Sequence, residues 1–205
     1  MIKIGLTGSV GMGKSETAKM FAAEGVPVFD ADAEVHRLYQ KGGAAAALLA
    51  RGFPSVVIDG RVDRGLLAEK VLNDSLQLAK LERIVHPFVE SACFSVVQEA
   101  EAKGATMIVL DIPLLFEKSR TLEVDVIVVV TAPPEVQRER VLERPGMTEA
   151  KFESILKRQT PDNEKRHGAD FVVLTDKGLD FAREQVRKII ELVRAGRTSS
   201  DTVSG

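Results

Sequence analysis

The sequence predicts an α/β domain in which a mainly parallel sheet is covered by helices on both faces. Five short and almost continuously apolar runs indicate strands that are buried on both sides. These runs lie at residues 2–6, 26–30, 106–111, 124–130 and 170–175. Stretches with helical composition separate the runs, as the crossovers of a parallel sheet require. The 205 residues, 44% hydrophobic and 28% charged, suffice for one such domain with its own core.

The first run leads into a glycine-rich stretch and then into residues 15–23, whose composition favours a helix. Gly25 follows where glycine commonly ends a helix, because it adopts the left-handed conformation without steric cost. The second run, VPVFD at 26–30, ends in an acid. The first 30 residues therefore predict a strand, a loop, a helix and a second strand.

About 75 residues separate the second run from the third, which is more than a simple crossover needs. Four apolar residues in this interval keep the spacing of one helix face: Leu81, Ile84, Val85 and Phe88. We expect Pro87 to start a further helix, since proline disrupts a helix interior. The interval predicts a helical insert at about residues 33–104.

A second helical segment, at about 134–167, lies between the fourth and fifth runs. A final helix has one apolar face, formed by Leu179, Ala182, Val186, Ile189, Ile190 and Val193. The tail at 196–205 has almost nothing to bury, and we expect it to be flexible. We therefore predict one domain over residues 1–195.

Composition excludes several classes of protein. The formal net charge of -2 provides no field that would attract nucleic acid or an anionic membrane. Cys93 is the only cysteine, which excludes an internal disulfide and fits a reducing compartment. No apolar run approaches the ~20 residues of a spanning helix, and the N-terminus does not resemble a signal peptide. We expect a cytoplasmic protein with no nucleic-acid or membrane partner.

The stretch GLTGSVGMGKSE at 5–16 contains the pattern Gly-x-x-x-x-Gly-Lys-Ser, between a predicted strand and a predicted helix. Glycines let backbone N–H groups converge on phosphate oxygens, and a helix N-terminus attracts the same anions. The lysine of this pattern binds the β- and γ-phosphates, and the serine hydroxyl binds Mg²⁺. A glycine-rich turn that binds nothing is the alternative. The predicted nucleotide contacts are Gly8, Gly11, Met12, Gly13, Lys14, Ser15 and Glu16, with Ser15 as metal ligand.

A nucleotide site alone leaves a GTPase, an ATPase motor or a small-molecule kinase open. The chain has no Asn-Lys-x-Asp sequence near a strand end to read guanine, and no long basic face for a DNA motor. Asp30 and Asp32 follow the second strand, at the sheet edge where α/β proteins bind ligands. Asp30 suits the N-cap of the next helix. Asp32 is the candidate base for an attacking hydroxyl, and His36 lies one helical turn later.

Six stretches, in this order, are GLTGSVGMGKS, VPVFDAD, DGRVDRGLLAEKVL, LERIVHP, LDIPLLFE and ADFVVL. Together they resemble the dephospho-coenzyme A kinases, from about residue 2 to residue 194. The resemblance implies a three-layer P-loop kinase with a five-stranded sheet, a helical substrate-binding insert and a helical lid. It also implies transfer of the γ-phosphoryl group of ATP, with Mg²⁺, to the ribose 3′-hydroxyl of dephospho-CoA. This reaction gives CoA and ADP and completes coenzyme A biosynthesis.

By the same resemblance Asp32 is the catalytic base, residues 33–104 hold the CoA moiety and the region 134–167 covers ATP. The expected acceptor contacts are Asp32, His36, Arg64, His86, Asp111, Leu114 and Leu115. Five of these residues have a simpler interpretation. The two histidines can be structural residues, Arg64 can be an exposed residue at a helix start, and the two leucines can belong to the core. Asp111 ends the third strand, near the expected place of Mg²⁺ or acceptor.

The lid region nearly balances its charges, which makes it a poor nucleic-acid surface. Arg140 and Arg144 have i,i+4 spacing and can point from one helix face toward ATP. Guanidinium groups suit the charge that spreads over the transferring phosphoryl oxygens. We therefore expect Arg140, with Lys14, to act in catalysis and both arginines to contact ATP. The alternative is a solvated face of Glu–Arg pairs.

Three residues depart from the family pattern. Glu16 stands where a hydroxyl residue is usual, so its carboxylate must point away from the phosphates. Thr175 stands where the family tends to have asparagine near the adenine, and Pro54 replaces a usual glycine in the insert. A kinase for another small acceptor and a non-catalytic nucleotide sensor remain the alternative functions.

Overall fold

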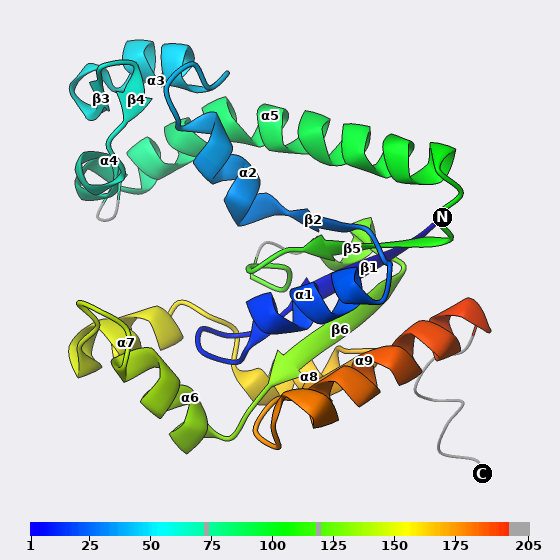
Figure 1. The fold of residues 1–205 in the computed structure, drawn as a ribbon. Helices are drawn as coiled ribbons and strands as arrows, with labels where there is room; N and C mark the ends of the chain where they lie inside the picture. Colours follow the sequence, from blue (N-terminus) through cyan, green and yellow to red (C-terminus); the bar gives the residue numbers. More distant parts are fainter. Residues whose placement is uncertain (72–73, 118–119, 197–205) are drawn as a thin grey trace. The chain divides into compact units, whose positions relative to one another are not determined.

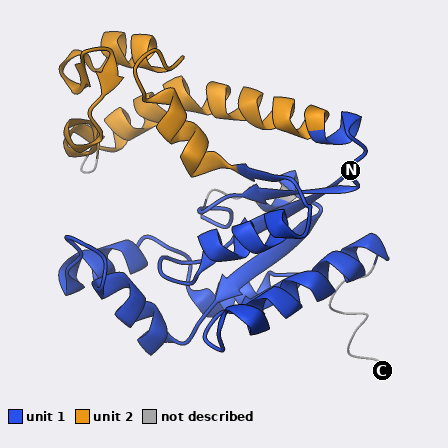
Figure 2. Cartoon of the chain, in the orientation of Figure 1, with its two compact units in different colours: residues 1–29, 100–205 blue, residues 30–99 orange. Residues whose placement is uncertain are grey.

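The structure is a computed structural model that describes residues 1–71, 74–117 and 120–196 (Figure 1). The described residues form two compact units (Figure 2). The first comprises residues 1–29 and the described residues from 100 onward, and the second comprises residues 30–99. The second unit contains most of the predicted insert. Residues 197–205 of the predicted tail lie outside the described residues.

The first unit is built on a five-stranded sheet with the order β2-β5-β1-β6-β7. Its strands are β1 (Ile2–Thr7), β2 (Val28–Asp30), β5 (Met107–Asp111), β6 (Val126–Thr131) and β7 (Phe171–Leu174). The pairs β1–β5, β1–β6 and β6–β7 are parallel. The predicted α/β class with a mainly parallel sheet is confirmed, and each strand lies within two residues of its predicted run.

Register places the apolar runs side by side. Ile4 of β1 lies opposite both Val109 of β5 and Val126 of β6, and all three are buried. Because these strands are parallel, their carboxyl ends meet at one edge of the sheet. The loops after β1, β5, β6 and β7 therefore leave from this edge, and the candidate site is built from them.

Helices α1 (Lys14–Ala23) and α9 (Leu179–Arg194) contact one another and pack on the sheet (Figure 1). Together they bury the core of the first unit, to which the predicted face of α9 contributes Ala182, Val186, Ile189, Ile190 and Val193. The prediction is wrong for Leu179, whose side chain is 60% exposed. It occupies the first helical position after Gly178, beyond the end of the sheet-facing stripe.

The region 134–167 forms three short helices of the first unit: α6 (Pro134–Leu142), α7 (Glu149–Leu156) and α8 (Asp162–His167). Pro134 occupies the first position of α6, where the missing N–H costs nothing. Thr148 caps α7 by accepting a hydrogen bond from the Lys151 N–H at 3.3 Å. A 3₁₀ helix, η2 (Arg120–Glu123), precedes β6.

The second unit contains helices α2 (Ala31–Leu38), α3 (Ala46–Gly52) and α4 (Arg64–Val71), and the 3₁₀ helix η1 (Pro54–Val56). It also contains a short antiparallel hairpin, β3 (Val57–Ile58) and β4 (Arg61–Val62). Sequence analysis did not predict this hairpin. Its turn is Asp59-Gly60, with φ angles of 51° and 77°, and Asp-Gly is a typical two-residue hairpin turn.

Helix α5 (Ser75–Ala102) continues through Pro87, so the prediction that Pro87 starts a new helix is wrong. Proline in a helix interior removes one hydrogen bond and costs about 3 kcal/mol. Apolar residues on both sides of Pro87 pack into one core, namely Leu81, Ile84, Val85, Phe88 and Val89. Val85 is buried and the other four are partly buried. Their combined burial offsets the local penalty, because one fully buried large apolar side chain already contributes about 1.5–3 kcal/mol. Among the described helices, α5 included, none has the length and apolarity to cross a membrane.

Candidate functional site

The glycine-rich loop at 8–13 joins β1 to α1, as the sequence predicts. Gly8 lies so close to β6 that a Cβ atom there would be 2.6 Å from the Val130 carbonyl oxygen. Gly13 is the N-cap of α1 with a φ of 94°, a conformation that residues with a side chain rarely adopt. The loop therefore presents its backbone at the N-terminus of a helix, where anions bind.

Lys14 follows this loop, and its Nζ donates to Asp111 Oδ1 at the end of β5. The Asp111 side chain is buried, and the Lys14 side chain is 16% exposed. Two predicted site residues, one at the start of α1 and one at the end of β5, thus meet at the carboxyl edge of the sheet. The ion pair keeps an ammonium group directly beside the glycine-rich loop.

Side chains from the region 134–167 hold the beginning of the loop. Gln137 of α6 donates from Nε2 to the Val10 carbonyl at 2.7 Å, and the Val10 N–H donates to Gln159 Oε1 at 3.1 Å. Lys165 of α8 contacts Ser9 Oγ at 3.3 Å. Sequence analysis missed these contacts, because nothing in the local pattern pairs residues more than 120 positions apart.

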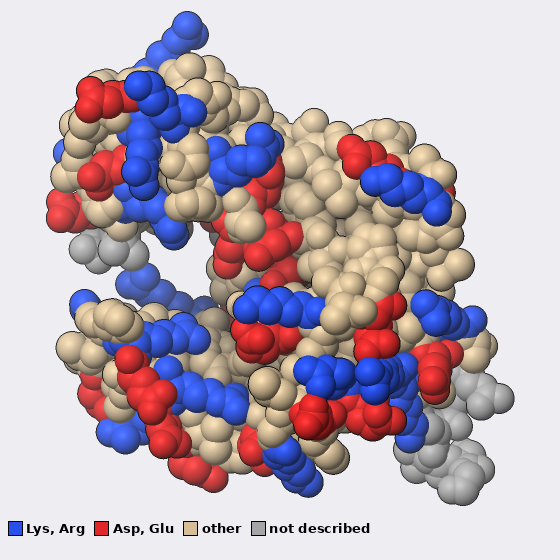
Figure 3. All heavy atoms as spheres, in the orientation of Figure 1, with Lys and Arg blue, Asp and Glu red and all other residues tan. Residues whose placement is uncertain are grey.

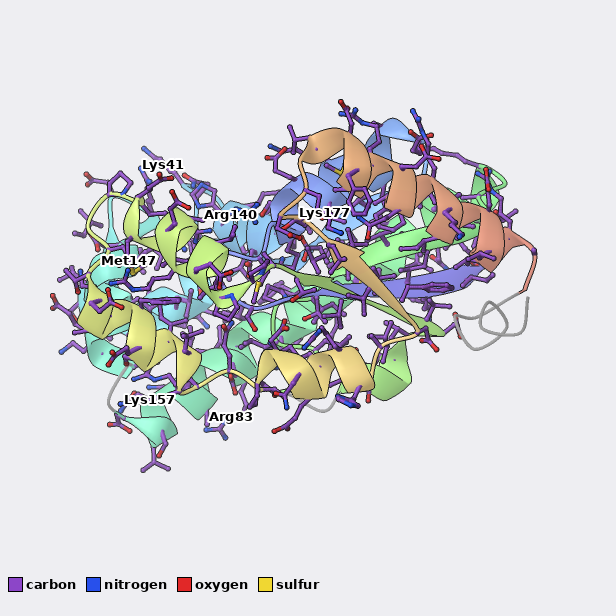
Figure 4. The ribbon with its side chains drawn as sticks, turned by 90° about the horizontal axis from the view of Figure 1, so that it is seen from below. Lys41, Arg83, Arg140, Met147, Lys157 and Lys177 are labelled. Atoms are coloured by element: carbon purple, nitrogen blue, oxygen red, sulfur yellow. The ribbon has the colours of Figure 1, made fainter. Side chains whose placement is uncertain are left out.

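Arg140 extends from α6 to the end of β7 (Figure 4). It donates from Nη1 to Thr175 Oγ1 at 2.8 Å and from Nη2 to the Thr175 carbonyl at 2.7 Å. The Thr175 hydroxyl in turn donates to the Met12 carbonyl in the loop at 2.8 Å. Thr175, the departure from the family pattern, therefore links the predicted lid arginine to the phosphate-binding loop.

Arg140 and Arg144 line one cavity of about 250 Å³, as their i,i+4 spacing predicts. The loop, α1 and the start of α9 complete its wall, with Gly11, Gly13, Glu16, Thr17, Met20, Thr175, Gly178, Leu179 and Ala182. The exposed face of Leu179 is thus part of this cavity. The Glu16 carboxylate, exposed on α1, forms an ion pair with Lys19 at 2.6 Å.

The two leucines predicted as acceptor contacts, in the loop after β5, differ in their exposure. Leu114 is 39% exposed and can be reached by a ligand. Leu115 is fully buried, and one of its methyl groups lies 3.1 Å from the place of a Cβ on Gly5. The structure therefore corrects the expectation for Leu115, which is a core residue because it fills the space beside Gly5.

In the second unit, Asp30 caps α2: its Oδ1 accepts a hydrogen bond from the Ala33 N–H at 2.9 Å. Asp32 lies exposed in the first turn of the helix, and His36 lies exposed one turn later. The ring Nε2 of His36 is 2.7 Å from the Gln40 amide nitrogen. The predicted division of roles, with Asp30 as cap and Asp32 left for chemistry, is compatible with this geometry. His86 is exposed in the middle of α5.

Arg64, the first residue of α4, lines a cavity of about 660 Å³ within the second unit. Lys41 and Arg61 line the same cavity, together with Gln40, Ile58, Asp59, Val62 and Asp63. Asp63 Oδ1 accepts a hydrogen bond from the Leu66 N–H at 2.9 Å and so caps α4. Burial raises the pKa of nearby Tyr39, and the positive charge of Arg64 partly opposes this increase. The cavity wall thus carries three cationic side chains.

Metal binding by protein groups alone has no support in the described part of the chain, which contains no group of three or more His, Cys, Asp or Glu suited to hold a metal. Mg²⁺ does not need such a group, because it usually keeps several waters and binds one or two protein oxygens plus substrate phosphates. Ser15 provides an exposed hydroxyl at the start of α1, and Asp111 provides a carboxylate at the adjacent strand end. These donors fit Mg²⁺ bound together with a nucleotide.

Comparison with known proteins identifies close relatives. A family model described as dephospho-CoA kinase matches residues 2–180. A dephospho-CoA kinase from Rhodopseudomonas palustris is 53% identical over 191 residues, covering 93% of this chain and 95% of the relative. A crystal structure from Thermus thermophilus has a TM-score of 0.82 at 34% identity, covering 92% and 95% of the two chains. A dephospho-CoA kinase from Campylobacter jejuni, 21% identical with a TM-score of 0.61 and covering 92% and 95%, shares the fold.

Proposed function

The chain belongs to the dephospho-CoA kinase family, and from this premise we propose how its residues transfer the γ-phosphoryl group of ATP to the 3′-hydroxyl of dephospho-CoA. The family's reaction is the ATP-dependent phosphorylation of dephospho-CoA, the last step of coenzyme A biosynthesis. The observation that carries the proposal is the meeting of Lys14 and Asp111 beside the glycine-rich loop. It supplies a buried charge pair where the phosphates of a nucleotide would bind.

ATP binds with its phosphates on the loop at 8–13 and the N-terminus of α1. Backbone N–H groups and the positive end of the helix dipole favour the anion there. Lys14 neutralises charge on the β- and γ-phosphates, and its ion pair with Asp111 keeps this lysine at the sheet edge. Mg²⁺ would be held by the Ser15 hydroxyl, with Asp111 as a further oxygen donor, and would stabilise the developing phosphate charge.

Arg140 and Arg144 contact ATP from the cavity between α6 and α1. A guanidinium group offers several N–H donors in one plane, which suits the oxygens of the transferring phosphoryl group. Thr175 places Arg140 by accepting its hydrogen bonds. The lid over ATP is the region 134–167, which excludes water that would otherwise take the phosphoryl group.

The second unit binds the acceptor. Its cavity suits the diphosphate of dephospho-CoA, because the cationic side chains of Lys41, Arg61 and Arg64 outnumber the two acidic ones in its lining. His36 and His86 are further acceptor contacts at exposed positions of this unit, and Leu114 is an exposed acceptor contact in the first unit. Asp32 accepts the proton of the 3′-hydroxyl while the oxygen of that hydroxyl forms a bond to the γ-phosphorus. The bond from that phosphorus to ADP breaks, and ADP leaves.

The reaction takes place in the cytoplasm, and dephospho-CoA and ATP are the partners. The single cysteine and the small net charge support this assignment. On the visible face of the first unit, Lys and Arg side chains lie among Asp and Glu side chains (Figure 3). A surface of mixed sign offers little to the phosphate backbone of a nucleic acid.

The test is ADP release from Mg²⁺-ATP, with and without dephospho-CoA. The wild type, Asp32→Asn and Asp30→Asn are compared, and Asp30→Asn is the matched control because asparagine also caps a helix. We expect acceptor-dependent turnover in the wild type and in Asp30→Asn, and its loss in Asp32→Asn. Turnover that survives Asp32→Asn would place the base elsewhere. An absence of any response to dephospho-CoA, with turnover of another acceptor, would contradict the proposed substrate.

A further inference from the structure

Lys165 of α8 is fully buried, although lysine is a charged residue. In the proposed mechanism it contacts no substrate. Its Nζ lies 2.8 Å from Glu117 Oε1 and 3.3 Å from Ser9 Oγ. Glu117 follows β5, and Ser9 belongs to the glycine-rich loop. One ammonium group therefore joins three segments of the first unit, and one of these segments is the phosphate site.

A contribution to stability does not by itself explain the buried ion pair of Lys165 and Glu117. Removing two charges from water is costly, and well-packed apolar residues often replace a buried ion pair without loss of stability. The Glu117 side chain is only 11% exposed, and its Oε1 also accepts a hydrogen bond from the Thr160 N–H at 2.8 Å. Within the described residues its Oε2 is buried and accepts no hydrogen bond. A partly satisfied polar cluster in a core indicates a role beyond packing.

Ser9 connects Lys165 to the backbone of the glycine-rich loop. Ser9 is buried, and its carbonyl accepts a hydrogen bond from the Met12 N–H at 3.2 Å. A shift of Ser9 therefore moves Met12, one of the predicted phosphate contacts. Val10 is held separately by Gln137 and Gln159. Loss of the Lys165 contact would displace one end of the loop while the other contacts keep it folded.

We propose that Lys165 is a positioning residue of the phosphate site, which sets the conformation of the glycine-rich loop through Ser9 and is itself fixed by Glu117. The inference rests on the proposed function only in taking this loop as the ATP site. Lys165 acts on nucleotide affinity and leaves the affinity for the acceptor unchanged.

The experiment measures ADP affinity by calorimetry, KM for ATP and for dephospho-CoA, and the midpoint of thermal unfolding. The variants are Lys165→Met, Ser9→Ala and their combination. Lys157→Met is the control, since Lys157 is exposed in the same region (Figure 4). We expect Lys165→Met and Ser9→Ala each to weaken ADP binding and raise KM for ATP about tenfold, the scale of one hydrogen bond to a charged group. KM for dephospho-CoA should stay within about twofold, as should every constant of Lys157→Met.

The combined variant is decisive, because residues that act through one contact have non-additive effects. We expect it to lose no more ADP affinity than either single variant. A merely structural Lys165 would lower the unfolding midpoint, leave the ADP affinity of the folded protein at the wild-type value, and so overturn the inference. If Lys165→Met does not fold, Ser9→Ala keeps the ion pair intact, and Lys165→Met with Glu117→Gln removes both charges. An ADP affinity equal to that of the wild type, in Ser9→Ala or in the variant that combines Lys165→Met with Glu117→Gln, would also overturn the inference.

These outcomes separate the inference from the proposed function. A wild type that binds ADP and phosphorylates dephospho-CoA, with variants that bind ADP equally well, overturns the inference alone. A wild type that binds ADP but ignores dephospho-CoA, with weakened variants, contradicts the proposed substrate and supports the inference. A wild type that does not bind ADP overturns both.

Discussion

Lys14 and Asp111 form an ion pair between the end of the glycine-rich loop and the end of β5. The two residues lie 97 positions apart in the chain. Lys14 is the first residue of α1, and Asp111 is the last residue of β5. The aspartate therefore holds the lysine at the sheet edge where phosphates are proposed to bind. We therefore propose that Asp111 acts in the phosphate site, in addition to its predicted place near Mg²⁺ or the acceptor.

Asp111→Asn should lower kcat/KM for ATP by about 100-fold, because it removes the buried charge that fixes Lys14 and an oxygen donor for Mg²⁺. Steady-state kinetics at saturating dephospho-CoA measure the effect. Asp125→Asn is the control: Asp125 Oδ2 accepts a hydrogen bond from the Lys3 N–H at 2.7 Å, and asparagine can accept the same bond. Wild-type kinetics in Asp111→Asn would show that the ion pair is dispensable.

Arg140→Lys should reduce kcat by about 10- to 100-fold, since a lysine cannot reproduce the two donors that the guanidinium directs at Thr175. Thr175→Val should raise KM for ATP several-fold by removing the hydroxyl that joins Arg140 to the loop. Both effects are measured with varied ATP. Arg138→Lys, on the same helix but paired with Glu149 at the surface, should stay within about twofold. An equal effect of Arg138→Lys and Arg140→Lys would contradict a specific role for Arg140.

The sequence predicted the sheet well, because a parallel strand that is buried on both faces must be a nearly continuous apolar run. It predicted Pro87 wrongly, because local sequence shows the cost of a proline but not the shared core that outweighs it. The β3–β4 hairpin was missed although Asp59-Gly60 is a strong turn signal. Strands of two residues carry no alternation that a pattern can detect.

The phosphate-binding loop was predictable because its chemistry depends on backbone and on consecutive residues. The contacts of Lys165 with Ser9 and of Arg140 with Thr175 were not, since they depend on which side chains the fold brings together. The sequence also could not distinguish Leu114 from Leu115. One lies at the surface and the other fills the space beside Gly5, and only the path of the loop decides this.

Glu117 should make stability depend on pH. Burial raises its pKa, but the hydrogen bond from Lys165 and backbone hydrogen bonds outweigh burial, so the pKa lies below the ordinary value of 4.5. Its stabilisation is therefore fully present above pH 4.5 and is lost as pH falls through the lower pKa of the folded protein. Glu117→Gln should cost about 3 kcal/mol at pH 7, as breaking a buried ion pair does.

Urea unfolding at pH 7 and at several values below pH 4.5 measures this effect. The difference in unfolding free energy between wild type and Glu117→Gln should shrink as the pH falls, because a protonated glutamate resembles glutamine. Glu149→Gln is the control, since Glu149 pairs with Arg138 at the surface, and it should cost at most about 1 kcal/mol at pH 7. A difference for Glu117→Gln that stays constant with pH would show that the carboxylate charge does not stabilise the fold.

Pro87→Ala should stabilise the protein by about 2 kcal/mol. Alanine restores the N–H that can donate to the carbonyl four residues earlier, which a proline removes at a cost of about 3 kcal/mol. It also gives the unfolded chain more freedom, which offsets up to about 1 kcal/mol. Because Pro87 is exposed, the substitution leaves the core residues on both sides of it in place. Urea unfolding of Pro87→Ala should therefore show a higher midpoint than that of the wild type. Ser91→Ala is the control, since Ser91 is exposed on the same helix, and it should change the free energy of unfolding by no more than about 0.5 kcal/mol. A Pro87→Ala protein less stable than the wild type would mean that α5 requires the conformation which proline imposes at this point.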